Sequence, residues 1–441
     1  MRSLLIVLAA AVVLSGCNRR VDMPDPHELS CHIGVYRLAD GTLVDVAPTD
    51  DPRLRWRKLD GTFGRLTKAE GGGWTSTLGL TDRPDGVKVG FGGCANGRIT
   101  FAGQTGARVP LTIGDTRFTS GEETLFGRLV LPVGDAPVPV VVMVHGSEKT
   151  AASIFNYRQR LYPAEGVGVF VYDKRGTGQS SGRYSQDFHR LSDDAAAALK
   201  EARKLAGARA GRVGFEAGSQ GGWVAPLAAS KVRPDFIVVG YGLAEGTLAE
   251  DREEVMLGLR EKGHGPEVLK KAREVTDATG EIMRSDYRNG WDALKAVKRK
   301  YGKEAWFEDL EGEFTGQFVH NPPIFVRLIG PMQDVGTSWE YDPMPVLRKL
   351  DVPLLWVLAA QDREAPIAET RRRLVALAAL GRPITVLEYP DTDHGMYLFE
   401  VGADGTRTPL RVTDGFTRAV LDFARTGRLE GDYGAAKRLT P

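Results

Sequence analysis

The stretch at residues 212–229 reads RVGFEAGSQGGWVAPLAA, and it decides how the rest of the chain is interpreted. A short apolar run ends at Ala217, and a helical pattern rich in alanine and leucine begins after Gly221. Ser219 lies between them among small residues, so the pattern predicts that this serine occupies a sharp turn from strand to helix. A turn this tight leaves no room for side chains two positions before and after the serine.

The same stretch differs by one methyl group from the G-x-S-x-G pattern in which hydrolases hold a nucleophilic serine. Ala217 stands where that pattern has its first glycine, while Gly218 and Gly221 are the other small residues of the elbow. A glycine-rich loop that merely opens a helix is a common alternative, and this stretch alone does not exclude it. The nucleophile hypothesis therefore depends on partners elsewhere in the chain.

The chain is long, and its charges are balanced. At 441 residues it exceeds the roughly 100–200 residues of an ordinary domain, so we expect two units with insertions. Its 58 basic and 57 acidic residues give no bulk attraction to nucleic acid or to acidic lipid. A substrate must therefore be selected by a site, no nucleic-acid partner is expected, and no feature assigns an oligomeric state.

The first residues have the pattern of an export signal. Arg2 supplies a positive charge, and residues 4–14 form an apolar run that is shorter than the roughly 20 residues a membrane-spanning helix needs. Leu14-Ser15-Gly16-Cys17 then resembles the bacterial lipobox. We expect a lipoprotein signal peptide over residues 1–16, a lipid anchor on Cys17 and a place in the bacterial cell envelope, at the outer membrane facing the periplasm. An ordinary signal peptide followed by a chance cysteine is the alternative.

Export also affects how the other cysteines are interpreted. Cys31 and Cys94 are the remaining thiols of the mature chain, and an oxidising compartment favours a disulfide between them. Two buried free thiols are the alternative. Their spacing and neighbours do not indicate a metal site, and we expect no metal and no cofactor.

The first part of the mature chain carries strand and turn signals without a helical period. Residues 17–33 are polar and contain proline, which predicts a tether. Over residues 34–112, hairpin turns such as Asp40-Gly41 and Asp60-Gly61 separate short strand patterns. The pattern predicts a small all-β domain, a sheet or a partial barrel, closed by the disulfide. We expect it to be a spacer or to pack against the next unit, and a substrate-binding module is the alternative.

Strand and helix signals alternate in the second part of the chain. Residues 138–144 form a continuous apolar run, which is typical of a strand buried on both faces of a parallel sheet. The alternation predicts a doubly wound α/β core over residues 113–242 and 346–430. Residues 243–345 interrupt it with a charged, mostly helical segment. Because this insertion follows a central strand, we expect it to cap the carboxyl edge of the sheet, where ligands bind in open α/β folds.

Chemically active residues directly follow several predicted strands. Because the carboxyl ends of parallel strands share one edge of a sheet, residues far apart in the sequence can converge with Ser219 in one cleft. The segments concerned are His145-Gly146-Ser147, Asp173 to Ser180, Asp362, and Asp391 to Gly395.

On these motifs and their order, residues 117–426 resemble the α/β-hydrolase superfamily, particularly its bacterial esterases and prolyl-oligopeptidase-like members. The family keeps its triad in the order Ser, acid, His, which here corresponds to Ser219, Asp362 and His394. The sequence departs from the family pattern at Ala217 and at the Ser147-Glu148 pair that follows His145-Gly146. The resemblance implies a serine hydrolase, while the cap and the β-domain match the family only loosely.

The chemistry assigns a role to each residue. Ser219 is a poor nucleophile unless His394 takes its proton, and Asp362 is expected to accept the other imidazole N–H. The oxyanion needs preorganised donors, and we expect the backbone N–H of Gln220 and a donor from Ser147. Alternative acids are Glu364 and Asp334, whereas Asp393 is expected to point away; His145, Asp173 and Arg175 are interpreted as structural.

Three functions remain open at this point, and acyl transfer to an acceptor other than water differs from the first only in the acceptor. The leading hypothesis is a serine hydrolase that cleaves a small ester, or a short acyl or peptidyl substrate, through an acyl-enzyme. A prolyl-oligopeptidase-like peptidase would use the same triad, but about 80 residues of hairpins are too few for a propeller of about seven blades of roughly 40 residues each. Ester hydrolysis is therefore favoured. A non-catalytic envelope-binding lipoprotein on an inactive hydrolase scaffold is the third hypothesis, and the intact triad positions argue against it.

Overall fold

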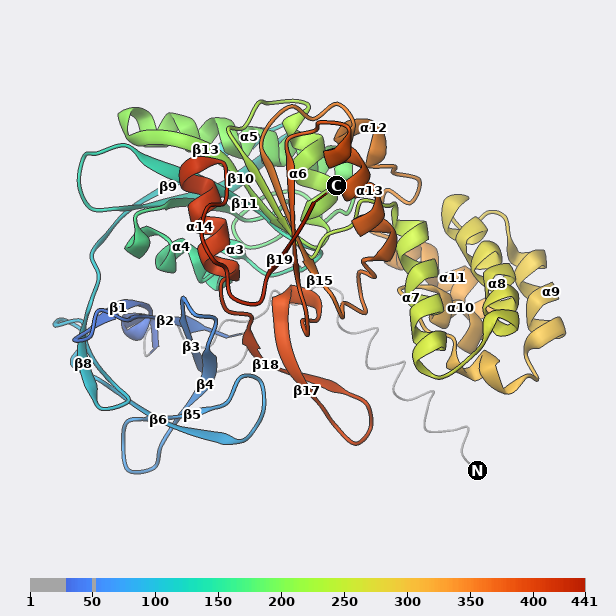
Figure 1. Cartoon of the computed structure of the whole chain (residues 1–441), viewed down its shortest axis with the longest axis horizontal. Helices are drawn as coiled ribbons and strands as arrows, with labels where there is room; N and C mark the ends of the chain where they lie inside the picture. Colours follow the sequence, from blue (N-terminus) through green and yellow to red (C-terminus); the bar gives the residue numbers. More distant parts are fainter. Residues whose placement is uncertain (1–28, 50–52, 441) are drawn as a thin grey trace.

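The computed structural model describes residues 29–49 and 53–440, which form a β-barrel, a central sheet with helices on both faces, and a helical cap (Figure 1). The expected signal peptide over residues 1–16 and the lipidated Cys17 lie outside the described residues. Within the described ranges, no helix is both long enough and apolar enough to cross a membrane.

The N-terminal unit is a closed barrel of short antiparallel strands. Strand β8 pairs back onto β1, so the sheet has no free edge, and Tyr36, Trp56 and Phe101 fill its interior. The predicted all-β domain is confirmed, and its sheet is fully closed. Its strands, in chain order, are β1 (Gly34–Leu38), β2 (Leu43–Pro48), β3 (Leu54–Lys58), β4 (Phe63–Lys68), β5 (Trp74–Thr77), β6 (Pro84–Phe91), β7 (Arg98–Phe101) and β8 (Gln104–Arg108).

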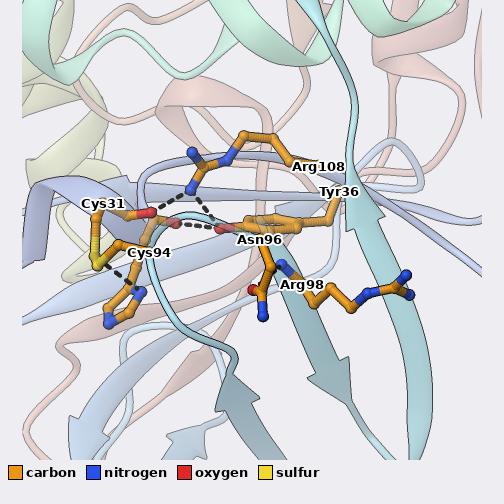
Figure 2. The surroundings of a disulfide bond; sticks show 7 residues. Cys31, Tyr36, Cys94, Asn96, Arg98 and Arg108 are labelled. Carbon is orange, nitrogen blue, oxygen red and sulfur yellow. Dashed lines mark hydrogen bonds between the residues drawn. A yellow bond between two sulfur atoms is a disulfide. The ribbon is translucent and has the colours of Figure 1, made fainter.

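A disulfide joins Cys31 to Cys94 at one end of this barrel, as predicted (Figure 2). Cys31 lies on a short 3-10 helix, η1 (Ser30–His32), and the guanidinium of Arg108 donates a hydrogen bond to its carbonyl oxygen. The His32 ring stacks on Phe91 with ring centroids 4.2 Å apart. The tether expected over residues 17–33 is therefore wrong at its end, because the disulfide and this stacking hold residues 30–32 on the barrel.

We expect the Cys31→Ser/Cys94→Ser double variant to lose about 4 kcal/mol of unfolding free energy in the barrel. The disulfide closes a loop with a sequence separation of 63 residues, and a loop of that length restricts the unfolded chain by about this amount. Denaturant unfolding of wild type and variant measures the difference. Two alkylatable thiols in the non-reduced wild-type protein would contradict the disulfide itself.

The second unit is built on a nine-stranded sheet in the order β19-β16-β15-β14-β13-β11-β12-β10-β9. Strands β11 to β16 run parallel, which confirms the predicted α/β core. The sheet extends past the predicted end at residue 430, because β19 pairs antiparallel with β16. The strands are β9 (Leu111–Ser120), β10 (Glu123–Pro132), β11 (Val138–Val144), β12 (Gly168–Tyr172), β13 (Ala210–Gly218), β14 (Ile237–Gly240), β15 (Leu354–Ala359), β16 (Ile384–Tyr389) and β19 (Lys437–Leu439).

Helices bury both faces of this sheet. Along β11, Val140 and Val142 belong to one apolar cluster and Val141 and Met143 to another, because successive side chains of a strand point to opposite faces. Helices α5, α6, α12 and α13 contribute to the first cluster, and α3, α4 and α14 to the second. Their bounds are α3 (Ala152–Phe155), α4 (Arg158–Leu161), α5 (Phe188–Ala206), α6 (Gly221–Ala229), α12 (Met344–Leu347), α13 (Ala368–Ala379) and α14 (Phe416–Thr426).

The insertion between β14 and β15 is a helical cap with an apolar core of its own, as predicted, and it lies to the right in Figure 1. Leu259, Ile282 and Phe318 are among the side chains buried in that core. The cap elements are α7 (Thr247–Glu261), α8 (Pro266–Arg284), α9 (Trp291–Tyr301), η4 (Ala305–Asp309), α10 (Thr315–His320) and α11 (Pro323–Gln333).

A hairpin that the sequence analysis missed connects the core to the barrel. Strands β17 (Tyr397–Val401) and β18 (Arg407–Val412) pair with each other beside the barrel (Figure 1). The ring of Tyr397 lies 5.9 Å from that of Phe63, and the backbone N–H of Leu80 donates to the carbonyl of Pro409 at 2.9 Å. The barrel thus packs against the segment that directly follows His394.

Buried charges form a second contact between the barrel and the core. Arg160 on α4 donates two hydrogen bonds to Asp45 on β2, at 2.6 and 3.1 Å, and the Asp45 side chain is fully buried. Beside this pair, the Arg57 guanidinium lies over the Tyr157 ring, 4.3 Å from its centroid. Removal of Arg160 would leave the buried carboxylate without both of these hydrogen bonds, so this pair helps to fix how the two units dock.

Candidate active site

Ser219 occupies the predicted turn from strand to helix. It lies between the end of β13 and the start of α6, and its φ of +51° falls in the left-handed region that is strained for residues with a side chain. Its backbone N–H donates to the carbonyl of Gly240 at the end of β14, at 3.2 Å. The serine therefore stands at the carboxyl edge of the parallel sheet.

The small residues around the turn explain why alanine is tolerated at position 217. A Cβ placed on Gly221 would lie 2.5 Å from the Val144 carbonyl oxygen and 3.2 Å from the Ala217 methyl. A Cβ on Gly218 would lie 2.4 Å from the Tyr241 hydroxyl. Glycine is thus required at 218 and 221, while the Ala217 methyl fits because no side chain faces it at 221.

His394 and Asp362 form a hydrogen-bonded pair at the same edge. Asp362 follows β15 and its side chain is fully buried, and His394 opens the short 3-10 helix η5 (His394–Met396) after β16. The imidazole Nδ1 lies 3.1 and 3.0 Å from the two Asp362 carboxylate oxygens. Asp362 Oδ1 also accepts the backbone N–H groups of Glu364 and Ala365, at 3.0 and 2.8 Å. These bonds orient the carboxylate toward the imidazole.

This pair sets the protonation of the imidazole. Burial by itself would lower the pKa of His394, but the hydrogen bond and the negative charge of Asp362 outweigh it and hold the pKa above its ordinary value. The carboxylates of Glu364 and Asp393 act in the same direction. The buried carboxylate thus stabilises the imidazolium form.

Ser219 and His394 line one cavity of about 400 Å³. No hydrogen bond joins the Ser219 hydroxyl to the imidazole among the described contacts. The imidazole Nε2 instead lies 3.6 Å from Oε2 of Glu364, whose side chain is 73% exposed. The serine and the imidazole thus share one cavity, the buried Asp362 carboxylate lies at Nδ1 of the imidazole, and the exposed Glu364 carboxylate lies near its Nε2.

Of the two expected oxyanion donors, Ser147 lines this cavity and Gln220 lines a smaller cavity beside it, which Ser219 and His394 also line. Gln220 directly precedes α6, and its backbone N–H has no acceptor within the described chain. Ser147 lines the cavity on the loop after β11, where Tyr184 donates to its carbonyl and Lys174 donates to the Gly146 carbonyl at 2.6 Å. These two bonds hold the backbone of Gly146 and Ser147 in place beside the cavity.

His145 takes no part in this arrangement as a base. Its Nε2 donates to the Tyr172 carbonyl at 3.0 Å, and the ring is buried, which lowers its pKa. Arg175 forms a two-pronged pair with buried Asp194, at 2.7 and 2.8 Å, and Asp173 accepts the backbone N–H of Ser153 at 2.9 Å. These three residues brace loops around the cleft.

The alternative acids occupy other positions. Asp393 pairs with Arg407 at 2.9 Å and accepts the backbone N–H of His394, so its carboxylate is directed away from the imidazole nitrogens. Asp334 accepts the backbone N–H groups of Gly336 and Thr337 at the end of α11. Of these acids, only Glu364 approaches the imidazole, and it does so at Nε2 instead of Nδ1.

Sequence reasoning missed several residues of the cleft. Tyr241, which follows β14, meets the His394 ring edge-on at 4.9 Å. Arg158 on α4 and Glu216 on β13 form a buried pair 3.3 Å apart in the wall of the cavity. Glu216 was visible as a charge inside an otherwise apolar strand run, but Arg158 and Tyr241 carry no local signal.

The Glu364→Gln variant is expected to keep its activity while its pH profile moves. Because the Glu364 charge helps to raise the pKa of His394, its removal should lower that pKa. A general base must be neutral, so the acidic limb of kcat/KM against pH should shift to lower pH. Glu311→Gln, an exposed carboxylate paired with Lys262, is the matched control. An acidic limb that stays in place or moves to higher pH would contradict the assignment of His394.

The chain matches one protein family and several solved structures. The model of the alpha/beta hydrolase family matches residues 141–404. No curated protein matches the sequence significantly. Among solved structures, the acylaminoacyl peptidase of Pyrococcus horikoshii is 14% identical with a TM-score of 0.40, over 80% of this chain and 52% of its own. This chain thus spans about half the length of that peptidase.

Two further solved structures are esterases. An esterase of Pyrococcus furiosus is 14% identical with a TM-score of 0.40, over 65% of this chain and 85% of its own. Brefeldin A esterase, described as a bacterial homologue of human hormone-sensitive lipase, is 15% identical with a TM-score of 0.39, over 65% of this chain and 70% of its own.

Proposed function

Because the chain belongs to the alpha/beta hydrolase family, we propose that it is a serine hydrolase that cleaves carboxylic esters through an acyl-enzyme. The observation that carries this proposal is the pairing of His394 Nδ1 with buried Asp362, at 3.0 Å, beside a cavity that the strained Ser219 turn also lines. These residues supply a nucleophile, a base and a group that orients the base.

Each residue then has a chemical task. His394 Nε2 takes the proton of Ser219 as its oxygen attacks the ester carbonyl, and Asp362 stabilises the imidazolium that forms. The N–H of Gln220 and a donor of the Ser147 loop hold the oxyanion, and loss of one such donor costs about 3–4 kcal/mol. His394 returns the proton to the leaving alcohol, and a water molecule activated by the same imidazole releases the acid.

A hydrogen bond between Ser219 and the imidazole is not needed before substrate binds. Catalytic hydrogen bonds are often long before substrate binds and shorten in the complex. Glu364, at 3.6 Å from Nε2, stands where the serine hydroxyl must approach. Because its side chain is largely exposed, it can turn into solvent as the substrate enters.

A peptidase would use the same triad, and substrate preference separates the two functions. We expect p-nitrophenyl esters of short acyl chains to be cleaved with a higher kcat/KM than aminoacyl p-nitroanilides. The buried charges of Arg158 and Glu216 in the cavity wall disfavour long alkyl chains, so kcat/KM should fall as the acyl chain lengthens. Faster cleavage of the anilides would favour the peptidase instead.

We further propose that the chain is exported and held at the bacterial envelope by a lipid on Cys17. The sequence pattern around Cys17 supports this location, and a disulfide between Cys31 and Cys94 suits an oxidising compartment. Metabolic labelling with palmitate in a bacterial host should mark the wild type and not the Cys17→Ala variant. Equal labelling of both would contradict the anchor.

A further inference from the structure

The cleft at Ser219 continues beneath the cap into a second, smaller cavity of about 80 Å³. We call it the cap cavity. Both the cap and the core contribute to its walls, and Ser219 and His394 border it as they border the first cavity. The lining side chains that matter here are Ser219, Gln220, Glu250, Glu313, Glu364 and His394.

Carboxylates crowd this cavity. Glu250 lies on α7, Glu313 lies in the cap loop before α10, and Glu364 comes from the core loop after β15. Glu254 lies one turn after Glu250 on α7. Among the described lining residues, His394 is the only side chain that can carry a positive charge. A small space between the cap and the core thus has acids on several sides and no fixed cation to balance them.

The protonation of these acids reflects the crowding. Burial, together with the neighbouring carboxylates, raises the pKa of Glu250 well above its ordinary value and that of Glu254 to about 8. Glu313 is exposed to solvent, but partial desolvation and the charge of Glu364 also raise its pKa. Ionised carboxylates packed together without a counter-charge are unfavourable, and a bound cation would relieve that cost.

A buried amide oxygen points to the same kind of ligand. The side chain of Gln220 lines the cap cavity, the residue is 6% exposed, and its Oε1 accepts no hydrogen bond. Buried acceptors are normally satisfied, so an orphan acceptor in a cavity wall calls for an N–H or O–H donor from a ligand. This amide is independent of the acids, because it belongs to the core beside the nucleophile.

The acids are held in place by the structure around them. Asp251 on α7 is buried, and its Oδ1 accepts the backbone N–H groups of Phe314 and Thr315, both at 2.9 Å. Its Oδ2 accepts the Thr315 hydroxyl at 2.6 Å. Because Glu313 directly precedes these residues, the contacts fix the loop that carries its carboxylate over the cleft.

The chemistry of the lining favours an organic cation over a metal ion. Within the described residues, no group of three or more His, Cys, Asp or Glu side chains is placed to hold a metal. Trp223, Trp339 and Phe188 form aromatic walls of the cap cavity, and aromatic rings attract organic cations. An ammonium or guanidinium group offers both the charge that the carboxylates need and the N–H donors that the Gln220 oxygen needs.

We propose that the cap cavity binds a positively charged, N–H-bearing group of the substrate, so that the enzyme prefers cationic esters over neutral ones of the same shape. This inference rests on the proposed function, since it assumes that Ser219 is the nucleophile. Glu250 and Glu313 then act as specificity determinants supplied by the cap, with Gln220 as the hydrogen-bond acceptor from the core.

Two pairs of matched esters test the inference on the full chain. In the first pair the acyl part carries the charge, and p-nitrophenyl 4-(aminomethyl)benzoate is compared with p-nitrophenyl 4-ethylbenzoate. In the second the alcohol part carries it, as 4-(aminomethyl)phenyl acetate against 4-ethylphenyl acetate. We expect the cationic member of at least one pair to have a kcat/KM at least about tenfold higher, the size of one favourable charge contact. Equal or faster cleavage of the neutral member in both pairs would overturn the inference.

Variants of the cap then show whether the carboxylates cause the preference. In the double variant Glu250→Gln/Glu313→Gln, the ratio of kcat/KM for the cationic ester to kcat/KM for the neutral ester should fall toward one. A loss of total activity affects both esters and leaves this ratio unchanged. Glu313→Gln alone changes an exposed residue and should lower the ratio in the same direction if the double variant fails to fold. Glu311→Gln, exposed and two residues away, should keep the wild-type ratio. A preference unchanged in the Glu313→Gln variant would contradict the proposed site.

The result also separates this inference from the proposed function. A fluorophosphonate probe that fails to label Ser219 would remove the nucleophile and, with it, the proposed function. Labelling of Ser219 together with equal hydrolysis of both pair members would remove only the cation preference.

Discussion

Replacing Ser219 with alanine is expected to lower kcat for ester hydrolysis by about 10⁶-fold, the size of effect seen when a triad nucleophile is removed. In the proposed mechanism the Ser219 oxygen forms the acyl-enzyme, and no other hydroxyl lies in the strained turn at the carboxyl edge of β13 within the described chain. Steady-state hydrolysis of p-nitrophenyl acetate, corrected for the spontaneous reaction, measures the loss.

The fold should survive this change. Alanine keeps the Cβ of serine, so the strain at a φ of +51° is the same in both proteins, and the backbone bond to the Gly240 carbonyl remains. Thermal unfolding of Ser219→Ala should therefore match that of the wild type. A folded variant with activity within about tenfold of the wild type would rule out Ser219 as the nucleophile.

Asp362→Asn is expected to lower kcat by about 10⁴-fold while the protein remains folded. The asparagine can keep its Oδ1 as the acceptor for the backbone N–H groups of Glu364 and Ala365. Its amide would then present N–H to Nδ1 of His394, where the carboxylate now lies at 3.0 Å. The imidazole would take the tautomer that has its proton on Nε2, and it could no longer accept the proton of Ser219.

The comparison with Glu364→Gln makes this prediction specific. Both changes remove one negative charge near His394, but only Asp362 contacts Nδ1. Asp362→Asn should lose turnover at every pH, whereas Glu364→Gln should shift the acidic limb and keep the maximum. Near-normal turnover in Asp362→Asn would move the orienting acid to another residue.

The order of elements and the triad positions were accessible from the sequence because each depends on a local pattern. The apolar run at 138–144 and the strand-to-helix signal around Ser219 are properties of neighbouring residues, and a parallel sheet brings their carboxyl ends together. The sequence therefore predicted that Ser219, Asp362 and His394 lie at one edge of the sheet, where each follows a parallel strand in the structure.

Other features depend on contacts between distant segments. Closure of the barrel requires β1 to pair with β8, and the sequence of neither strand predicts this pairing. The β17–β18 hairpin was missed although Asp404-Gly405 forms its turn, because Pro409 interrupts the second strand pattern. The strand β19 is only three residues long, and pairing with β16 alone defines it.

The cap cavity could not have been predicted for the same reason. Glu250 and Glu313 belong to a segment in which acidic and basic residues alternate, and such residues usually face solvent. Only the fold brings two of these carboxylates together with Glu364 and the Gln220 amide. The proposed substrate selection thus involves the cap and the core together, while the proposed triad comes from the core alone.

The most direct test of the central claim is the reaction of the protein with a fluorophosphonate probe, followed by mass spectrometry of the labelled peptide. If Ser219 is the nucleophile, the wild type should carry one phosphonylated residue, Ser219, and Ser219→Ala should carry none. An unlabelled wild type, or equal labelling of the wild type and the alanine variant, would contradict it.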